Sequence, residues 1–221
     1  MADETNTRSR RKMAVNWVLG VLIANLGVCL STKSGLGMSM IGAMPYVLHR
    51  WGWASWGEGW FTQGTAEYVM EAIILIVTCL IVRGFRPRYL LSFLTAVISG
   101  LTIDGWFLVL GGNGVCGSMA LRVLLFILGM LVTALGIAFF FRTDWPLQVY
   151  ELCVAEVTER YRLNRTKVKY VFDASCLVLA VVMSLVLLKG LTGVGIATVI
   201  IVLCNSGLIA FFGKCLDKLG R

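Results

Sequence analysis

The sequence predicts an all-α membrane protein with six transmembrane helices, arranged as a 3+3 inverted repeat in which each half has an extra amphipathic or re-entrant helix. The 221-residue chain is 58% hydrophobic and 14% charged, with a mean hydropathy of +0.82. Soluble domains are about a quarter charged. Six apolar stretches approach the roughly 20 residues that a spanning helix needs. The first three stretches also resemble the last three.

The expected spans fall at residues 13–31, 64–82, 89–111, 118–141, 169–188 and 191–213. We interpret 1–221 as a single membrane domain, with a tail at 1–12, a first repeat at 13–111, a second repeat at 118–213 and a tail at 214–221. A cleaved signal peptide is the rival interpretation of residues 8–30, because a basic start precedes an apolar run there. The recurrence of this segment later in the chain favours a retained helix.

The basic residues predict the orientation. Of the 20 lysines and arginines, all but four fall in segments that are cytoplasmic if the N-terminus is inside; the four outside are Lys33, Arg50, Arg122 and Lys189. Such a bias is the positive-inside pattern, so both termini are expected in the cytoplasm. The net charge of +8 is then a signal of topology. It does not indicate nucleic-acid binding, because the charges are divided among short loops.

Two pairs of segments indicate an internal duplication. "VLGVLIANLGV" at 18–28 matches "ILGMLVTALGI" at 127–137, including two glycines in each, and "YVMEA" at 68–72 matches "YVFDA" at 170–174. An odd number of spans per half makes the second half enter the membrane from the opposite side. Inverted repeats of this kind recur among secondary transporters, whose sites lie where the halves meet. The paired glycines are expected to allow close helix packing.

Each half also has a segment between its first two spans, at 35–51 and 144–163. Its apolar residues recur at steps of three and four, which predicts a helix. One interpretation is an amphipathic helix on the membrane surface. The other is a re-entrant helix whose N-terminus faces a central cavity and holds an anionic group. The candidate binding residues where these segments begin are Ser34, Gly35, Gly37, Asp144 and Trp145.

Polar residues inside the spans are the strongest candidates for a substrate or ion site. Glu71 and Asp104 fall in the outer half of the membrane, and Asp173 and Asn205 at the matching inner depth. A charge at the bilayer centre costs roughly 3 kcal/mol on insertion scales, and such residues usually face the protein interior. The alternative is an anchor near the interface, or an internal pair with Arg122. Asn25, on the first span, is a candidate ligand or a helix-packing residue.

Other chemistry finds little support in the sequence. The seven cysteines include no CxxC pair, His49 is the only histidine, and there is no HExxH or Walker A motif. Free thiols are therefore expected, with no metal site and no cofactor. No nucleophile–base pair is visible, so we do not expect an enzyme, although a membrane enzyme is the fourth alternative for function.

Three stretches carry a resemblance to a known family. They are "LGVLIANLGVCLSTKSGLGMSMIGAMPYVL", its counterpart "LGMLVTALGIAFFFRTDWPLQVY", and "GVGIATVIIVLCNSGLIAFF" near the end. On these motifs the whole chain resembles the YczE/YyaS/YitT-like family of small bacterial integral membrane proteins. The resemblance implies a membrane fold and a multi-pass location in a bacterial cytoplasmic membrane more than it implies a substrate.

The function expected from these patterns is transport of a small organic solute by alternating access, with ion coupling as an option. The expected partners are the lipid bilayer and a small-molecule solute, with a second copy of the chain as a further candidate and no nucleic acid. A substrate-binding subunit, such as the capture component of an energy-coupling-factor transporter, is the second class; Gly20 and Ala24 could form its contact face. A membrane scaffold for another enzyme is the third.

Overall fold

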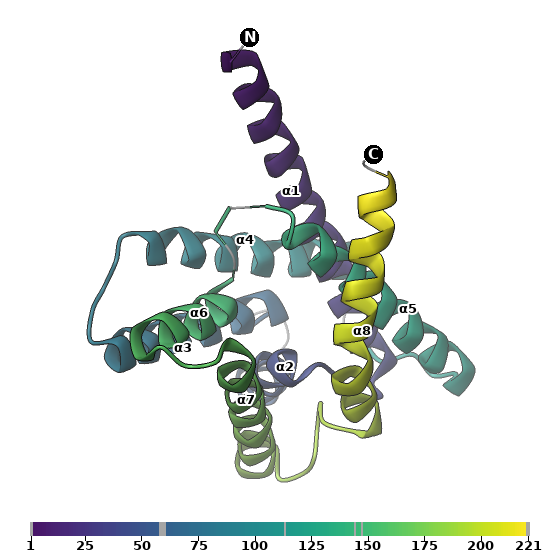
Figure 1. The fold of residues 1–221 in the computed structure, drawn as a ribbon. Helices are drawn as coiled ribbons and strands as arrows, with labels where there is room; N and C mark the ends of the chain where they lie inside the picture. The colour runs from purple at the N-terminus through teal and green to yellow at the C-terminus, as the bar shows by residue number, and fades with distance from the viewer. Residues whose placement is uncertain (1, 58–60, 113, 144, 147, 220–221) are drawn as a thin grey trace.

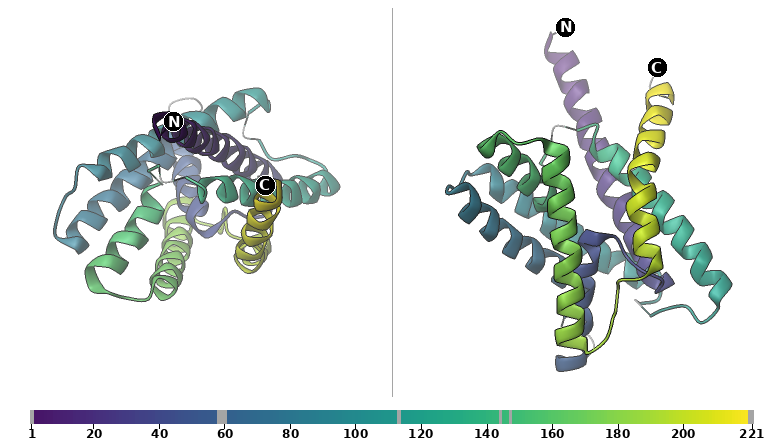
Figure 2. Two further views of the ribbon diagram at one scale, coloured as in Figure 1. Left: turned by 45° about the horizontal axis from the view of Figure 1, so that its top comes forward. Right: turned by 60° about the horizontal axis from the view of Figure 1, so that its bottom comes forward.

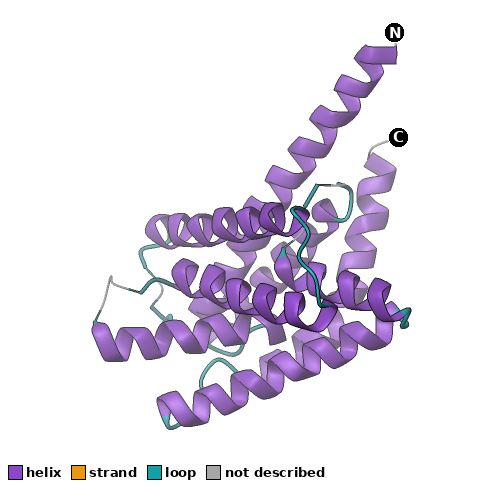
Figure 3. Cartoon of the chain, turned by 90° about the vertical axis from the view of Figure 1, so that its left-hand side faces the viewer, coloured by secondary structure: helices purple, strands orange, loops and turns teal. Residues whose placement is uncertain are grey.

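The computed structural model describes residues 2–57, 61–112, 114–143, 145–146 and 148–219. Across these ranges the chain forms α-helices joined by loops and no strand (Figures 1 and 3). The all-helical fold class is therefore confirmed. The helices are α1 (Ala2–Ser34), α2 (Met40–Trp56), α3 (Gln63–Val82), α4 (Arg88–Val109), α5 (Met119–Phe140), α6 (Val149–Tyr161), α7 (Arg165–Leu188) and α8 (Ile196–Leu219).

Five of these helices are long and apolar enough to cross a membrane: the Arg10–Ser34 part of α1, then α3, α4, α5 and the Thr166–Leu188 part of α7. Helix α8 becomes a sixth span only if its two parts, Ala197–Asn205 and Gly207–Lys218, are counted together across a bend of 42°. The six predicted spans thus correspond to five helices and one bent helix.

Helices α2 and α6 are the two extra helices, and both begin later than the sequence pattern predicts. Helix α2 begins at Met40 and not at residue 35, and α6 begins at Val149 and not at residue 144. Ser39 and Gln148 are in the cap positions of the two helices. Glycines 35 and 37 have positive φ angles of 59° and 147°, which side chains rarely tolerate. These backbone angles explain why α2 cannot begin at residue 35.

Helices α1 and α5 form a close antiparallel pair. A β-carbon added to Gly20 would lie 3.2 Å from the carbonyl oxygen of Gly136, and one added to Gly27 would lie 2.7 Å from that of Gly129. Early positions of α1 therefore meet late positions of α5. Small residues let helix backbones approach in this way within membranes, so these four glycines fix how the two halves of the chain meet.

The other helices pack around this pair. Helix α4 packs on α1 and α8 on α5, while α3 packs along α4 and the short helices α2 and α6 each contact both α3 and α7 (Figure 2). A β-carbon on Gly100 would lie 2.5 Å from the carbonyl oxygen of Gly64, so α3 and α4 also cross closely. Helix α7 is not packed in this way on α8, and the two stand apart in Figure 1.

The main apolar core lies where α2, α3, α4, α6 and α7 meet. Its buried members are Ala43, Met44, Met70, Ile74, Ala96, Val149, Tyr150, Cys153, Cys176 and Ala180. The first turns of both short helices, α2 and α6, belong to this core. The two helices therefore begin inside the bundle, which brings backbone N–H groups without helical partners into its centre.

Candidate functional site

Glu71 of α3 lies against the first residue of α6. Its side chain is 0% exposed, and its Oε2 accepts a hydrogen bond of 2.9 Å from the backbone N–H of Val149. A helix N-terminus offers unpaired N–H groups and the positive end of the helix dipole, so it suits a carboxylate. The second oxygen, Oε1, is buried without a hydrogen-bond partner among the described residues. Glu71 therefore caps α6 with one oxygen and leaves the other free.

Two more polar side chains lie beside Glu71. Glu67 is one turn earlier on α3 and 8% exposed, and Tyr150 is the second residue of α6 and 2% exposed. The Tyr150 hydroxyl lies beside the Glu67 carboxyl group, with which it interacts. An ordinary tyrosine hydroxyl carries its proton at neutral pH. The Tyr150 hydroxyl therefore keeps its proton and remains a potential donor.

A hydrogen-bonded chain joins the start of α6 to α1 and α4. Asn25 donates to the Ser99 hydroxyl over 2.8 Å, and the Gln148 amide donates to the same hydroxyl, also over 2.8 Å. The Ser99 hydroxyl in turn lies 3.0 Å from Asn25 Oδ1. Trp17 and Thr95 both donate to the backbone carbonyl of the nearby Pro146 over 3.2 Å. The start of α6 is therefore held by three longer helices.

The residues that hold α6 lie near the middle of their own helices. Glu71 is mid-way along Gln63–Val82, and Asn25 and Ser99 are central in the spans Arg10–Ser34 and Arg88–Val109. At the other end of α6, the Tyr161 hydroxyl donates to the carbonyl oxygen of Ile81 over 2.7 Å, and Ile81 is next to the end of α3. Helix α6 therefore begins level with the middle of α3 and ends level with its C-terminus.

The structure places Asp104 away from Glu71. Its Oδ1 accepts a hydrogen bond of 2.9 Å from the backbone N–H of Gly64, and its Oδ2 one of 2.7 Å from the Thr62 hydroxyl. These contacts hold the end of α4 against the first turn of α3, whereas Glu71 is two turns further along. The two carboxylates that the sequence suggests as one outer cluster are thus at two separate sites.

The second predicted pair is also not brought together. Asp173 of α7 forms a salt bridge of 3.3 Å with Lys169, which also contacts Glu151 of α6 over 2.8 Å. Asn205 is half-buried on α8, and no hydrogen bond of its side chain is found among the described residues. Because α7 is not packed along α8, the two predicted inner residues do not form one site in this structure.

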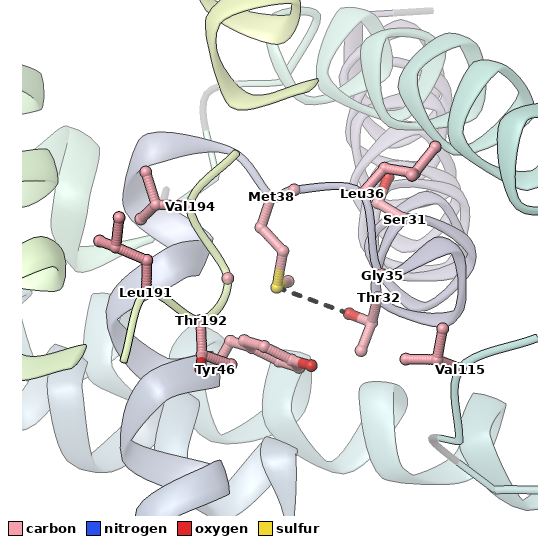
Figure 4. A pocket seen from close by; sticks show the side chains of 12 residues that line it. Ser31, Thr32, Gly35, Leu36, Met38, Tyr46, Val115, Leu191, Thr192 and Val194 are labelled. Carbon is pink, nitrogen blue, oxygen red and sulfur yellow. Dashed lines mark hydrogen bonds between the residues drawn. The ribbon is translucent and has the colours of Figure 1, made fainter. Parts of the chain in front are cut away.

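A small cavity lies at the end of α1. It has a volume of about 180 Å³ and is bounded by the last turn of α1, the loop to α2, Tyr46 and the loop between α7 and α8. Figure 4 shows Met38 and Tyr46 extending toward Thr32 across it. Of the predicted residues, Gly35 and Gly37 line the cavity, whereas the Ser34 hydroxyl turns to the carbonyl oxygen of Ser31 over 2.6 Å.

The remaining predicted residues take structural contacts or lie outside the described ranges. Arg122, the alternative partner for a buried acid, donates instead to the backbone carbonyls of Ser34 and Gly35 over 2.6 and 3.0 Å. Trp145 packs against Trp17 with 5.8 Å between ring centroids and an angle of 45° between the ring planes. Asp144 lies outside the described residues.

Two further buried carboxylates, Glu67 and Glu156, are not among the residues predicted from the sequence. Glu156 of α6 is 2% exposed and accepts a hydrogen bond of 2.7 Å from the Tyr89 hydroxyl. It also pairs with Arg86 over 3.3 Å and with Arg88. Glu156 therefore ties α6 to the loop between α3 and α4.

Comparison with known proteins identifies the family. Residues 11–214, nearly the whole chain, match the family described as "Family of unknown function (DUF6198)". The chain belongs to this family. It is also similar to the "Uncharacterized protein YyaS" of Bacillus subtilis (strain 168), with 28% identity over 195 residues, which cover 86% of this chain and 87% of the relative. The resemblance to YyaS-like proteins is thus confirmed. No solved structure matches.

Proposed function

We propose that the protein transports a small organic solute by alternating access, with its central site where α6 begins. The observation that carries this proposal is the position of Glu71: a fully buried carboxylate in the middle of a span, bound to the first N–H of a short helix. Ionisable groups inside membrane segments usually mark substrate or ion pathways. Short helices that begin in the membrane interior are the usual site-forming elements of secondary transporters.

Matching positions in the two halves support the inverted repeat that this mechanism needs. The same offset of 109 residues relates Gly20 to Gly129, Gly27 to Gly136, and the start of α2 at Met40 to that of α6 at Val149. Exchanging the halves also exchanges the contact of Gly20 with Gly136 for that of Gly129 with Gly27. This is the pattern expected of a two-fold axis at the crossing of α1 and α5.

Helix packing agrees with the same exchange except at two pairs. The contacts of α1 with α4, α2 with α3 and α2 with α7 have counterparts in those of α5 with α8, α6 with α7 and α6 with α3. Both exceptions involve α4 and α8: α4 packs along α3 and contacts α6, whereas α8 is not packed in the same way on α7 or on α2. In alternating access one repeat moves against the other. If the two halves are in different conformations, we expect this kind of difference, in which α4 and its counterpart α8 pack differently on their neighbours.

The proposed role of α6 follows from its depth. We interpret α6 as a re-entrant half-helix, because it begins level with the middle of three spans and ends level with the end of α3. Its N-terminus holds Glu71 in this structure, so an anionic group of a solute would have to compete with that carboxylate, whereas a cation would neutralise it. The cavity beside Gly35 and Gly37 is proposed as an outer approach to the site.

A thermal-shift screen of the purified protein against small metabolites tests this proposal. Wild type is compared with Glu71→Gln and with Glu159→Gln, a control at a carboxylate that is 65% exposed on the same α6 that Glu71 caps. A ligand at 100 times its Kd adds about 2.7 kcal/mol of stability. The proposal predicts at least one solute that stabilises wild type and Glu159→Gln but not Glu71→Gln. Stabilisation of all three proteins alike by every active solute would place the site elsewhere.

A further inference from the structure

We propose that Glu67 and Glu71 share one proton at neutral pH, which makes the proton the coupling ion of the transport proposed above. The coupling role rests on the proposed function. The proton site itself is argued from the contacts of the two carboxylates alone, and its test needs no transport.

The two carboxylates are buried together without a positive partner. They lie four residues apart on α3, hence on one face of the helix, and are 8% and 0% exposed. In the described part of the chain, no lysine or arginine forms a salt bridge with either one. Lys169 is engaged by Glu151 and Asp173, and Arg86 and Arg88 are engaged by Glu156.

The free energies favour one charge in this pair and not two. Burying an ion costs several kcal/mol even after the protein relaxes, and two carboxylates at such a site repel each other. A helix N-terminus stabilises a nearby anion by up to about 2 kcal/mol. That stabilisation is available once, through the Val149 N–H. The site therefore supports a single negative charge on Glu71, and Glu67 keeps a proton.

One unpartnered atom indicates where the shared proton is handled. Glu71 Oε1 is buried without a hydrogen-bond partner among the described residues, and an unsatisfied buried polar atom has a cost of about 1–3 kcal/mol. Glu67 lies one turn away on the same face of α3, beside the Tyr150 hydroxyl. A protonated Glu67 has an O–H to donate, and movement of its proton to Glu71 would leave the total charge of the pair unchanged.

A metal cation fits the site less well than a proton does. Hard cations in proteins take about six or more oxygen ligands. The side-chain oxygens available here come from Glu67, from Glu71 Oε1 and from the Tyr150 hydroxyl, which keeps its proton and interacts with Glu67. No group of three or more histidine, cysteine, aspartate or glutamate side chains suited to a metal occurs among the described residues.

The other titratable groups near this part of α3 supply no positive charge to the pair at neutral pH. They are Tyr150 and Cys153 on α6, Cys176 on α7, Asp104 on α4, and Tyr46 and His49 on α2. Burial lowers the pKa of His49, so this imidazole is neutral at pH 7. Arg50 on α2 is exposed and lies over the Trp53 ring, 4.9 Å from its centroid.

Infrared spectroscopy tests the proton directly. Protonated carboxylic acids have a C=O absorption separate from that of carboxylates, and the proposal predicts this band in wild type and Glu159→Gln at pH 7. It should be lost in the double variant Glu67→Gln/Glu71→Gln and should fade from wild type as the pH is raised. A band that is absent at pH 7, or that the double variant retains in full, would overturn the proposal.

A chemical label covers the case in which the double variant does not fold. A hydrophobic carbodiimide reacts with protonated carboxyl groups in apolar surroundings, and mass spectrometry locates the modified residue in wild-type protein. We expect the label on Glu67 or Glu71 at pH 7, falling as the pH rises, and unchanged by added sodium chloride. If sodium suppresses the labelling at fixed pH, the site binds a sodium ion and the proposed proton is wrong. If a solute binds but no label forms, the proposed transport function is retained and only the proposal of a shared proton is overturned.

Discussion

The carboxylate of Glu71 on α3 accepts a hydrogen bond from the backbone N–H of Val149, 78 residues away in sequence. This contact joins the two halves of the chain at the start of α6. Glu71 thereby gives a buried charge a partner and a buried helix end a cap. We expect its removal to affect both the stability of the protein and the geometry of the site.

The first prediction concerns the hydrogen bond itself. Glu71→Leu leaves the Val149 N–H buried without an acceptor, which costs about 1–3 kcal/mol, so the variant should unfold at a lower temperature than wild type. Glu71→Gln keeps a carbonyl oxygen for that N–H and should lose less than half as much stability. Thermal unfolding in detergent measures both. Equal losses in the two variants would show that the acceptor oxygen is not what matters.

The second prediction concerns the crossing of α1 and α5. A methyl group at Gly27 would press on the backbone of α5, at Gly129 and Thr133, and overpacking of this kind costs about 1–3 kcal/mol. Gly27→Ala should therefore lower the unfolding temperature. Gly105 lies in α4 with nothing within 4 Å of an added β-carbon. Gly105→Ala should therefore leave the unfolding temperature unchanged or raise it. Similar behaviour of the two variants would argue against the close crossing.

The third prediction compares two glutamates on α6. Glu156 is buried and bonded to Tyr89, Arg86 and Arg88, whereas Glu159 contacts the same arginines with 65% of its side chain exposed. Since both arginines are about half exposed, water screens part of each ion pair. We expect Glu156→Ala to lose about 1–3 kcal/mol and Glu159→Ala less than about 1 kcal/mol. The ranking is checked by denaturant titration, and the reverse order would contradict the assigned contacts.

The fourth prediction concerns orientation, which remains an expectation from the basic residues. If both termini are cytoplasmic, Cys116 in the loop between α4 and α5 faces the outside and Cys215 near the end of α8 faces the inside. Variants that retain only one of these cysteines are treated in intact cells with a membrane-impermeant maleimide. Cys116 should react and Cys215 should react only after lysis. The opposite result would invert the topology.

The sequence was sufficient for the all-helical fold class and most span positions. Glu71 stands out as a candidate because it is an ionisable residue in an apolar run, and its role stays a prediction. The sequence was not sufficient for the residues that meet Glu71. The contact with Val149 depends on how deep α6 begins, and the helical pattern placed that start five residues too early. The expected cluster of Glu71 with Asp104 depended on the register of α3 against α4. The close contact of Gly64 with Gly100 sets that register and takes Asp104 to the first turn of α3.

Solute exchange tests the central claim most directly. The protein is reconstituted in lipid vesicles loaded with the best ligand from the thermal-shift screen, and entry of the same ligand in labelled form is followed over time. The account predicts exchange by wild type and by Glu159→Gln, and a loss of at least about tenfold, or 1.4 kcal/mol, in Glu71→Gln. Exchange by wild type no faster than in protein-free vesicles would contradict transport, and full exchange by Glu71→Gln would contradict the site.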